Sequence, residues 1–358
     1  MSAQFSRVGT VRRALRSAAG PDAVTIEPLT ADGNPPMVVR PKEPGTDLAT
    51  WAAASKEWVA DALLEHRALL FRGWPVADAP GFQRFVAAVS DGEPLQYRDR
   101  STPRDEVSQN VYLSTTYPAA ERIEPHNEGT YWSTWPQKLF FCCLIAPPVG
   151  GETPIIDNRK VIERIPVAVR ERLERLGVRY VRNYNSGFGL TWQEGYQTDS
   201  RADVDRYAAA NGTVTEWLEG DRLRTVQIRP AVRTHPVTGE KLWFNHAGFF
   251  HISSRDPQMR EALVEALGED GLPTTTTHGD GSPIADEDVR AINEAYRAGE
   301  IAFRWEVGDV MMLDNMSMAH ARRPYEGDRK IVVVMTDPVS GEDATQSGPA
   351  VAADGEEA

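Results

Sequence analysis

The stretch PHNEGTYWSTWPQKLFFCCLIAPPVGGETPIID spans Pro125–Asp157 and opens with a His-x-Glu triplet, His126-Asn127-Glu128. On an extended segment, successive side chains point to opposite faces, so His126 and Glu128 would share one face. An imidazole and a carboxylate on one face supply two of the three ligands of a 2-His-1-carboxylate site. Such a site suits Fe(II) and leaves three coordination positions open.

The third ligand should be distant in sequence and close in space, and His320 is the candidate among the seven histidines. It lies between two short apolar runs, Val310–Leu313 and Ile331–Met335, which both indicate buried strands. We expect His320 in the connection between these strands, with Arg329 at the start of the second. A histidine beside a strand, followed by an arginine, suits a metal ion together with an anionic co-substrate.

Seven stretches carry recognisable motifs: RDRSTPR (98–104), YLSTTYP (112–118), PHNEGTYWSTWP (125–136), GGETPIIDNRKV (150–161), THPVTGEKLWFNHAGFFH (234–251), HGDGSPI (278–284) and GDVMMLDNMSMAHARRPYEGDR (308–329). In these stretches, which occur in family order and cover about two thirds of the chain, the sequence resembles the Fe(II)/2-oxoglutarate-dependent dioxygenases of the taurine dioxygenase/clavaminate synthase (TauD/TfdA-like) superfamily. It is most similar to the branch of carrier-bound amino-acid hydroxylases of nonribosomal peptide pathways.

This resemblance implies the cofactors and the residues that hold them. Fe(II) would be bound by His126, Glu128 and His320, and 2-oxoglutarate would bind the metal while O₂ acts as the second co-substrate. Arg329 matches the family's arginine for the distal carboxylate of 2-oxoglutarate, and Thr153 matches the threonine that assists it. A guanidinium pairs bidentately with a carboxylate, which a lysine does less well. Because Glu128 is present, the resemblance favours oxygenation over halogenation.

Substrate residues are expected at Asn245 in WFNHAGFF, at Arg322 beside His320, and at Arg104, which forms a basic cluster with Arg98 and Arg100. A metal-bound histidine usually donates its second ring N–H to a fixed acceptor, and Asp314 or Asn315 is near His320 in sequence. The remaining histidines are expected to serve the core, the cavity wall or turns. His246 and His251 lie in an aromatic stretch, and His235 and His278 lie in Pro/Gly turns.

Three interpretations of function remain open. The first is a hydroxylase of specialised (antibiotic-type) metabolism that acts on an amino acid or a derived group, either as a free small molecule or tethered to a carrier protein. The second keeps the same ligands but gives desaturation, cyclisation, epoxidation or isonitrile formation. The third is a non-catalytic metal-binding jelly-roll protein, which an assay of 2-oxoglutarate consumption distinguishes from the other two.

The composition of the chain indicates which classes of partner and which cellular compartment to expect. The chain of 358 residues has a formal net charge of −13, which makes a nucleic-acid partner unfavourable. Its two cysteines, Cys142 and Cys143, are adjacent and lie in an apolar run, which indicates buried thiols in a reduced compartment. No apolar run reaches membrane-spanning length, and no secretory signal is evident. The sequence predicts a cytoplasmic protein without a membrane partner and leaves the oligomeric state open.

Many short strands, Gly/Pro-rich turns and a few helices predict a mainly β fold with peripheral helices. The resemblance sharpens this to a double-stranded β-helix, or jelly-roll, core. We expect one dioxygenase domain over residues 1–338, with an insertion or lid at residues 186–293, and an acidic disordered tail over residues 339–358. The expected elements include helices at Asp47–His66, Ala79–Ser90 and Asn158–Leu176, a strand at Phe303–Glu306, and a hairpin-like pair at Val226–Val232 and Lys241–Asn245.

Overall fold

The computed structural model describes residues 20–95, 98–100, 106–108, 110–115 and 117–341. Its largest sheet has eight strands in the order β1 (Val24–Pro28), β2 (Met37–Pro41), β3 (Ala68–Phe71), β16 (Val310–Asp314), β7 (Thr134–Ile145), β19 (Lys330–Ser340), β5 (Val111–Leu113) and β4 (Glu106–Ser108). All neighbouring strands are antiparallel except β2 and β3. The central strands β3 and β16 are continuous apolar runs that are buried along their whole length.

Strand β7 shows how the sequence places this sheet between two layers. Phe140 and Cys142 pack on one side, with helices α2 (Leu48–Ala54), α3 (Lys56–His66) and α4 (Ala79–Val89). Phe141 and Cys143 alternate with them and pack on the other side of the sheet. This period of two is the property of a strand that is buried on both faces. Both cysteines are free and buried, as predicted, and burial raises the pKa of the Cys143 thiol to about 12.

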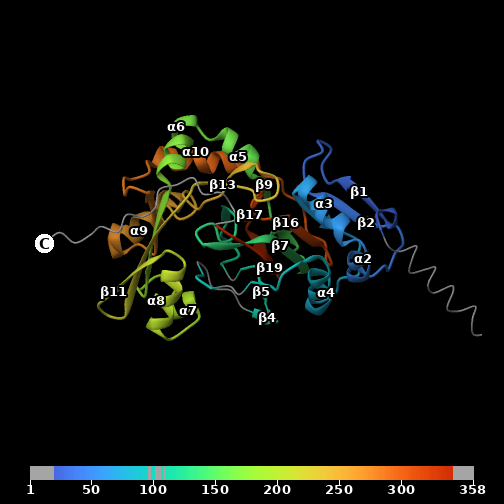
Figure 1. Cartoon of the computed structure of the whole chain (residues 1–358), viewed down its shortest axis with the longest axis horizontal. Helices are drawn as coiled ribbons and strands as arrows, with labels where there is room; N and C mark the ends of the chain where they lie inside the picture. The colour runs from blue at the N-terminus through green and yellow to red at the C-terminus, as the bar shows by residue number, and fades with distance from the viewer. Residues whose placement is uncertain (1–19, 96–97, 101–105, 109, 116, 342–358) are drawn as a thin grey trace, which may run out of the picture.

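The second side of the large sheet is covered by a smaller sheet. It has three antiparallel strands in the order β6 (Ile123–His126), β17 (Met318–Arg322) and β9 (Ile155–Asp157). The short pair β8 (Val149–Gly150) and β18 (Tyr325–Glu326) extends this region. Helices α5 (Asn158–Arg164), α6 (Val167–Leu176) and α10 (Asp286–Arg297) lie beyond it, at the top of the view in Figure 1.

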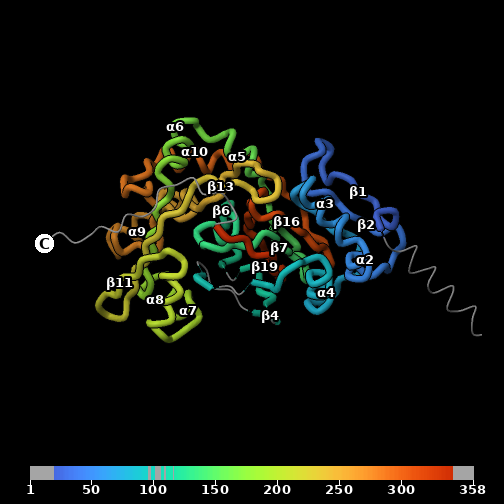
Figure 2. Tube along the Cα trace, viewed as in Figure 1, coloured from blue at the N-terminus to red at the C-terminus, as the bar shows by residue number. Residues whose placement is uncertain are grey.

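The segment predicted as an insertion contributes to a separate four-stranded sheet. The strand order is β11 (Val214–Leu218), β12 (Arg222–Arg229), β10 (Val178–Tyr184) and β15 (Thr274–His278). Figure 2 shows that this region, with helices α7 (Trp192–Tyr196), α8 (Arg201–Ala210) and α9 (Pro257–Leu267), lies on the opposite flank from α2–α4. The remaining elements are the strand pair β13 (Val232–Thr234) and β14 (Lys241–Trp243) and the short 3-10 helices η1 (Pro21–Ala23), η2 (Ile252–Ser254) and η3 (Glu269–Gly271).

Two predicted helices are each divided into two, so the predictions of single helices are wrong. The first helix breaks at Ser55, whose hydroxyl oxygen accepts the backbone N–H of Gly20. The second breaks at Pro166, which has no N–H to donate to the preceding turn. Apolar spacing continues across both breaks, because the pieces pack on the same core. Periodicity alone therefore does not reveal either break.

Three other predicted boundaries differ from the structure. The segment Phe303–Glu306 is not a strand; it buries Phe303 and Trp305 without joining a sheet. The predicted pairing of Val226–Val232 with Lys241–Asn245 is replaced by β13 with β14, since β12 ends at Arg229 and pairs with β10 and β11. Strand β19 reaches Ser340, so the predicted start of the tail at residue 339 is two residues early. Residues 342–358 of that tail lie outside the described residues.

Candidate metal centre and anion site

Three side chains form a potential metal site in the interior. The ligand atoms of His126, Glu128 and His320 all lie within 4.8 Å of one another. The His320 Nε2 is 3.8 Å from the Glu128 Oε1, and the rings of His126 and His320 are 4.4 Å apart between centroids. His320 and Glu128 are buried, and His126 is partly buried. The sequence predicted this trio, and the structure brings its members together.

Strand pairing explains why two histidines so far apart in sequence meet. In the small sheet, His320 on β17 lies directly opposite His126 on β6, and the register shifts just after this pair. His320 therefore lies within a strand, and our expectation of a connection between strands was wrong. Because β17 is the central strand of this sheet, its pairing with β6 on one side and β9 on the other holds the His320 backbone in place.

The His-x-Glu triplet is not one extended segment, because β6 ends at His126. The chain turns at Glu128 and continues through Gly129, which has a φ of +70°. A Cβ atom at this position would approach the ring of Trp132 to 2.3 Å, so the turn requires glycine. The turn, rather than strand alternation, brings the Glu128 carboxylate next to the histidines.

Buried amide side chains hold this turn in place. The Asn315 Oδ1 accepts the Glu128 backbone N–H at 2.9 Å, and its Nδ2 donates to the carbonyls of Glu128 and Pro136 at 2.9 and 2.8 Å. Asn127 donates to the Asn315 carbonyl at 2.5 Å and accepts from Asn158 at 3.0 Å. Asn127, Asn158 and Asn315 have no exposed surface. The sequence suggested Asn315 as a partner of His320, but its side chain binds the backbone of Glu128 instead.

Asp314, the other candidate partner for His320, is engaged elsewhere. Its carboxylate pairs with the Nε2 of His235 at 2.8 Å and accepts from Gln137 at 2.7 Å. The Nδ1 of His235 accepts the backbone N–H groups of Val237 and Thr238 at 3.2 and 3.1 Å. His235 therefore stabilises a turn, as the sequence predicted.

A backbone carbonyl sets the tautomer of His126. The His126 Nδ1 lies 2.9 Å from the carbonyl oxygen of Glu124 and must donate to it, since a carbonyl only accepts. The Nε2 then carries the lone pair with which a histidine ligates a metal ion, and this is the usual tautomer of ligating histidines. The ring centroids of Phe249 and His126 are 4.7 Å apart, and Phe249 itself is partly exposed.

His246 supports the same turn without belonging to the trio. Its Nε2 donates to the Asn127 carbonyl at 2.9 Å, and its ring lies 6.1 Å from that of His126. Burial lowers the pKa of His246 to about 3, so the imidazole is neutral. The sequence placed this histidine in the core or the cavity wall, and the structure agrees.

A second polar site surrounds Arg329, at the start of β19. Its Nε donates to the Gly151 carbonyl at 3.0 Å, its Nη1 to the Ser114 Oγ at 3.2 Å and its Nη2 to the Thr153 Oγ1 at 3.3 Å. Burial lowers the Arg329 pKa to about 10, so the side chain remains charged near neutral pH. The structure thus unites the predicted pair Arg329 and Thr153 and adds Ser114, which sequence reasoning missed.

Arg329 forms no ion pair with a carboxylate of the described residues. The negative charge of Glu152 raises the Arg329 pKa slightly, but Glu152 forms no salt bridge with Arg329. A cation that has lost much of its hydration is costly unless an anion compensates it. The guanidinium is therefore suited to bind an anionic ligand.

The predicted substrate residues have other partners. The Arg322 guanidinium donates to the carbonyls of Tyr117, Pro118 and Glu121, and so holds the loop before β6. The Asn245 amide donates to the Ala231 carbonyl and accepts the Ala247 N–H, both within 2.9 Å. Both side chains hold backbone segments, and the buried Nε of Arg322 has no hydrogen-bond partner among the described residues, so the roles of both residues toward a substrate stay predictions. Arg104 lies outside the described residues.

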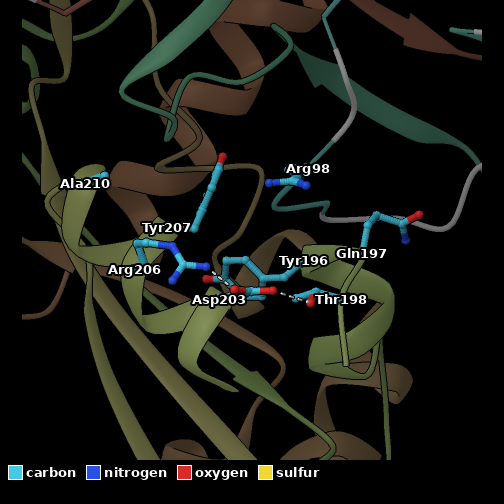
Figure 3. Close-up of a pocket in the computed structure, with 8 residues that line it drawn as sticks. All are labelled: Arg98, Tyr196, Gln197, Thr198, Asp203, Arg206, Tyr207 and Ala210. Carbon is cyan, nitrogen blue, oxygen red and sulfur yellow. Dashed lines mark hydrogen bonds and ion pairs between the residues drawn. The ribbon is translucent and has the colours of Figure 1, made fainter. Parts of the chain in front are cut away.

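Of the predicted basic cluster, Arg98 lines a separate hollow of about 360 Å³. Figure 3 shows this hollow next to helices α7 and α8, and it is lined by Arg98, Tyr196, Gln197, Thr198, Asp203, Arg206, Tyr207 and Ala210. Arg100 packs over the ring of Tyr112 instead. None of the three candidate metal ligands lines this hollow, so it is distinct from the metal centre.

Comparison with known proteins agrees with this geometry. Residues 25–336 match the model of the family described as "Taurine catabolism dioxygenase TauD, TfdA family". The dapdiamide synthesis protein DdaC of Enterobacter agglomerans is 40% identical over 281 residues, which cover 78% of this chain and 85% of DdaC. A clavaminate synthase-like protein of Arabidopsis thaliana is 31% identical over 290 residues, covering 77% and 83% of the two chains.

Solved structures support the fold. The crystal structure of PvcB from Pseudomonas aeruginosa has a TM-score of 0.52 at 16% identity and covers 90% of this chain and 94% of PvcB. No helix of the described residues is long and apolar enough to cross a membrane. The family match over residues 25–336 and the two relatives above establish that the chain belongs to the TauD/TfdA family of Fe(II)- and 2-oxoglutarate-dependent dioxygenases.

Proposed function

We propose that His126, Glu128 and His320 bind the Fe(II), and that Arg329 and Thr153 bind the distal carboxylate of 2-oxoglutarate. Two imidazoles and one carboxylate suit Fe(II) and leave room for a bidentate oxo acid and O₂. The observation that carries the proposal is the presence, in one fold, of this trio and of a desolvated arginine without a carboxylate partner. Bound iron and 2-oxoglutarate supply O₂ activation for oxidation of a substrate C–H bond, with release of succinate and CO₂.

The protein's own residues orient the ligands and limit the access of water. The Glu124 carbonyl fixes the His126 tautomer, and Asn315 fixes the backbone of Glu128. Phe141 packs 5.0 Å from the His320 ring and Phe249 packs against His126. Phe249 keeps an accessible surface beside the trio, so we assign it to the wall that receives the substrate.

We infer that the large sheet and the three-stranded sheet are the two halves of a jelly roll. The contact between Phe141 on β7 and His320 on β17 supports this arrangement, since it joins the two sheets face to face. Residues 1–338 would then be a single dioxygenase domain. Residues 186–293 would be an insertion in it, since they supply strands to a separate sheet.

We propose C–H hydroxylation of an amino acid, or of an amino-acid-derived group, as the reaction, in the biosynthesis of a specialised metabolite. The similarity to a dapdiamide synthesis protein supports this pathway class. The substrate is either free or tethered to a carrier protein. Desaturation is the second candidate outcome, because the tyrosine isonitrile desaturase of Erwinia amylovora is 21% identical over 319 residues.

A substrate screen tests the reaction. Purified enzyme with Fe(II), 2-oxoglutarate and O₂ is offered amino acids and their amides, both free and loaded on carrier domains. Succinate formation that depends on one of these compounds, with a product that gains one oxygen atom, would support hydroxylation. A product that has lost two hydrogen atoms would establish desaturation instead. Succinate release that no amino-acid-derived compound stimulates would contradict the proposed substrate class.

The amide clamp on Glu128 gives a prediction about metal affinity. We expect Asn315→Ala to weaken Fe(II) binding about 10- to 100-fold, because residues that orient a metal ligand have effects of this size. The measurement is an anaerobic Fe(II) titration. Asn245→Ala is the matched control, since it also removes a buried amide that binds two backbone groups. It should lower thermal stability and leave Fe(II) affinity unchanged, and equal losses of affinity would refute the role of Asn315.

A further inference from the structure

The hydrogen-bonding capacity around Arg329 is only partly used. A guanidinium has five N–H donors. Arg329 uses three of them, one on each nitrogen, toward Gly151, Ser114 and Thr153. One N–H therefore remains on each of Nη1 and Nη2. Two such donors on neighbouring nitrogens are the arrangement that grips a carboxylate bidentately.

The two hydroxyl groups beside Arg329 act only as acceptors. The Ser114 Oγ accepts from Arg329, and the Thr153 Oγ1 accepts from Arg329 and from the Trp305 Nε1 at 3.1 Å. Neither hydroxyl donates to an acceptor in the described part of the chain, and Thr153 is only 3% exposed. A buried donor without an acceptor destabilises the folded protein. The buried Thr153 O–H therefore lacks an acceptor among the described residues, and the partly buried Ser114 O–H is left as a donor toward the same open side.

Trp305 determines which way the Thr153 proton points. A hydroxyl oxygen has two lone pairs and one proton. The N–H groups of Trp305 and Arg329 occupy both lone pairs of Thr153, so its O–H is left as a donor toward the remaining open side. Trp305 is 3% exposed and packs 5.1 Å from Phe303 between ring centroids, which fixes the indole in place.

We propose that Ser114 is a further co-substrate-binding residue and that Trp305 is a positioning residue for Thr153. Together with Arg329 they form a four-donor cradle: two guanidinium N–H groups and the hydroxyls of Ser114 and Thr153. An ionised carboxylate offers about four lone-pair sites, so the cradle matches one carboxylate. This inference rests on the proposed binding of 2-oxoglutarate at Arg329. It implies selection of 2-oxo acids with a distal carboxylate over those that end in a methyl group.

The test compares two oxo acids on the Fe(II)-loaded enzyme under anaerobic conditions. Calorimetric titration measures the Kd for 2-oxoglutarate and for 2-oxopentanoate, which has the same chain length and a methyl group in place of the distal carboxylate. We expect Ser114→Ala to raise the Kd for 2-oxoglutarate about tenfold or more, since one hydrogen bond to a charged group is lost. The Kd for 2-oxopentanoate should not change.

Ser108→Ala is the matched control. Ser108 lies on β4, which pairs with β5, and its buried hydroxyl has no hydrogen-bond partner among the described residues. It should bind both acids as the wild type does. Equal losses for both acids in Ser114→Ala, or no loss for either, would overturn the role of Ser114 and leave the iron site standing. A wild-type enzyme that binds no 2-oxoglutarate would overturn the proposed function and the cradle together.

A double-mutant cycle tests Trp305. Trp305→Phe keeps an aromatic ring and removes the N–H, so it should weaken 2-oxoglutarate binding several-fold. In a Thr153→Val background the same change should have no further effect, because Trp305 acts through the Thr153 hydroxyl. Independent, additive losses in the double variant would show that Trp305 does not position Thr153.

Discussion

The Glu128→Ala variant is expected to lose Fe(II) affinity by more than about 100-fold and to release no succinate. Glu128 is the only carboxylate in the trio found among the described residues, and its removal leaves two imidazoles. Residues that merely orient ligands change affinity about 10- to 100-fold, so the loss of a ligand should exceed that range. The measurement is anaerobic Fe(II) titration of the purified variant, followed by a succinate assay.

Glu121→Ala is a suitable control for this prediction. Glu121 is exposed, and its hydrogen bonds involve its backbone, because its N–H donates to the Pro118 carbonyl and its carbonyl accepts from Arg322. Its variant should bind Fe(II) as tightly as the wild type. His126→Ala and His320→Ala should behave as Glu128→Ala does. Normal turnover by any of the three variants would remove that residue from the ligand set.

The Arg329→Ala variant should raise the 2-oxoglutarate concentration needed for half-maximal activity about 100-fold or more. The variant loses a cation and two charge-assisted N–H donors, each worth about 1.5–3 kcal/mol. Iron binding should persist, because Arg329 does not belong to the metal trio. Steady-state kinetics with 2-oxoglutarate as the varied substrate, together with Fe(II) titration, separates the two effects.

Two further variants sharpen the result for Arg329. Arg329→Lys keeps the charge but loses the planar fork, so it should fall between the wild type and Arg329→Ala. Arg323→Ala removes a partly exposed arginine that pairs with Glu300 at 3.6 Å, and such surface pairs contribute little. It should leave the 2-oxoglutarate requirement unchanged. An unaltered requirement in Arg329→Ala would move the anion site elsewhere.

The sequence was most informative where chemistry and periodicity are local. The continuous apolar run Val310–Leu313 identified β16, because a strand buried on both faces needs no polar alternation. The residue types of His126 and Glu128 predicted a candidate metal site, although a turn rather than strand alternation brings the two side chains together. The choice of His320 depended on the family resemblance as well, because the pairing of β17 with β6 brings together positions nearly two hundred residues apart.

The sequence was least informative about what each polar side chain binds. Arg322 and Asn245 were predicted from residue type alone, and the sequence did not reveal the backbone carbonyls and amides that both side chains hold. Ser114 and Trp305 drew no attention, because their roles arise only when three distant segments meet at Arg329. A polar side chain within a matching motif can serve the loop or the ligand, and only its hydrogen-bond partners distinguish the two.

The most direct test of the account is an anaerobic titration of the purified protein with Fe(II) and then 2-oxoglutarate, followed by visible absorption. The account predicts a weak metal-to-ligand charge-transfer band that saturates at one iron and one 2-oxoglutarate per chain and is absent in Glu128→Ala. A well-folded wild-type protein that binds Fe(II) but gives no band with 2-oxoglutarate would contradict the assignment of the iron and oxo-acid site.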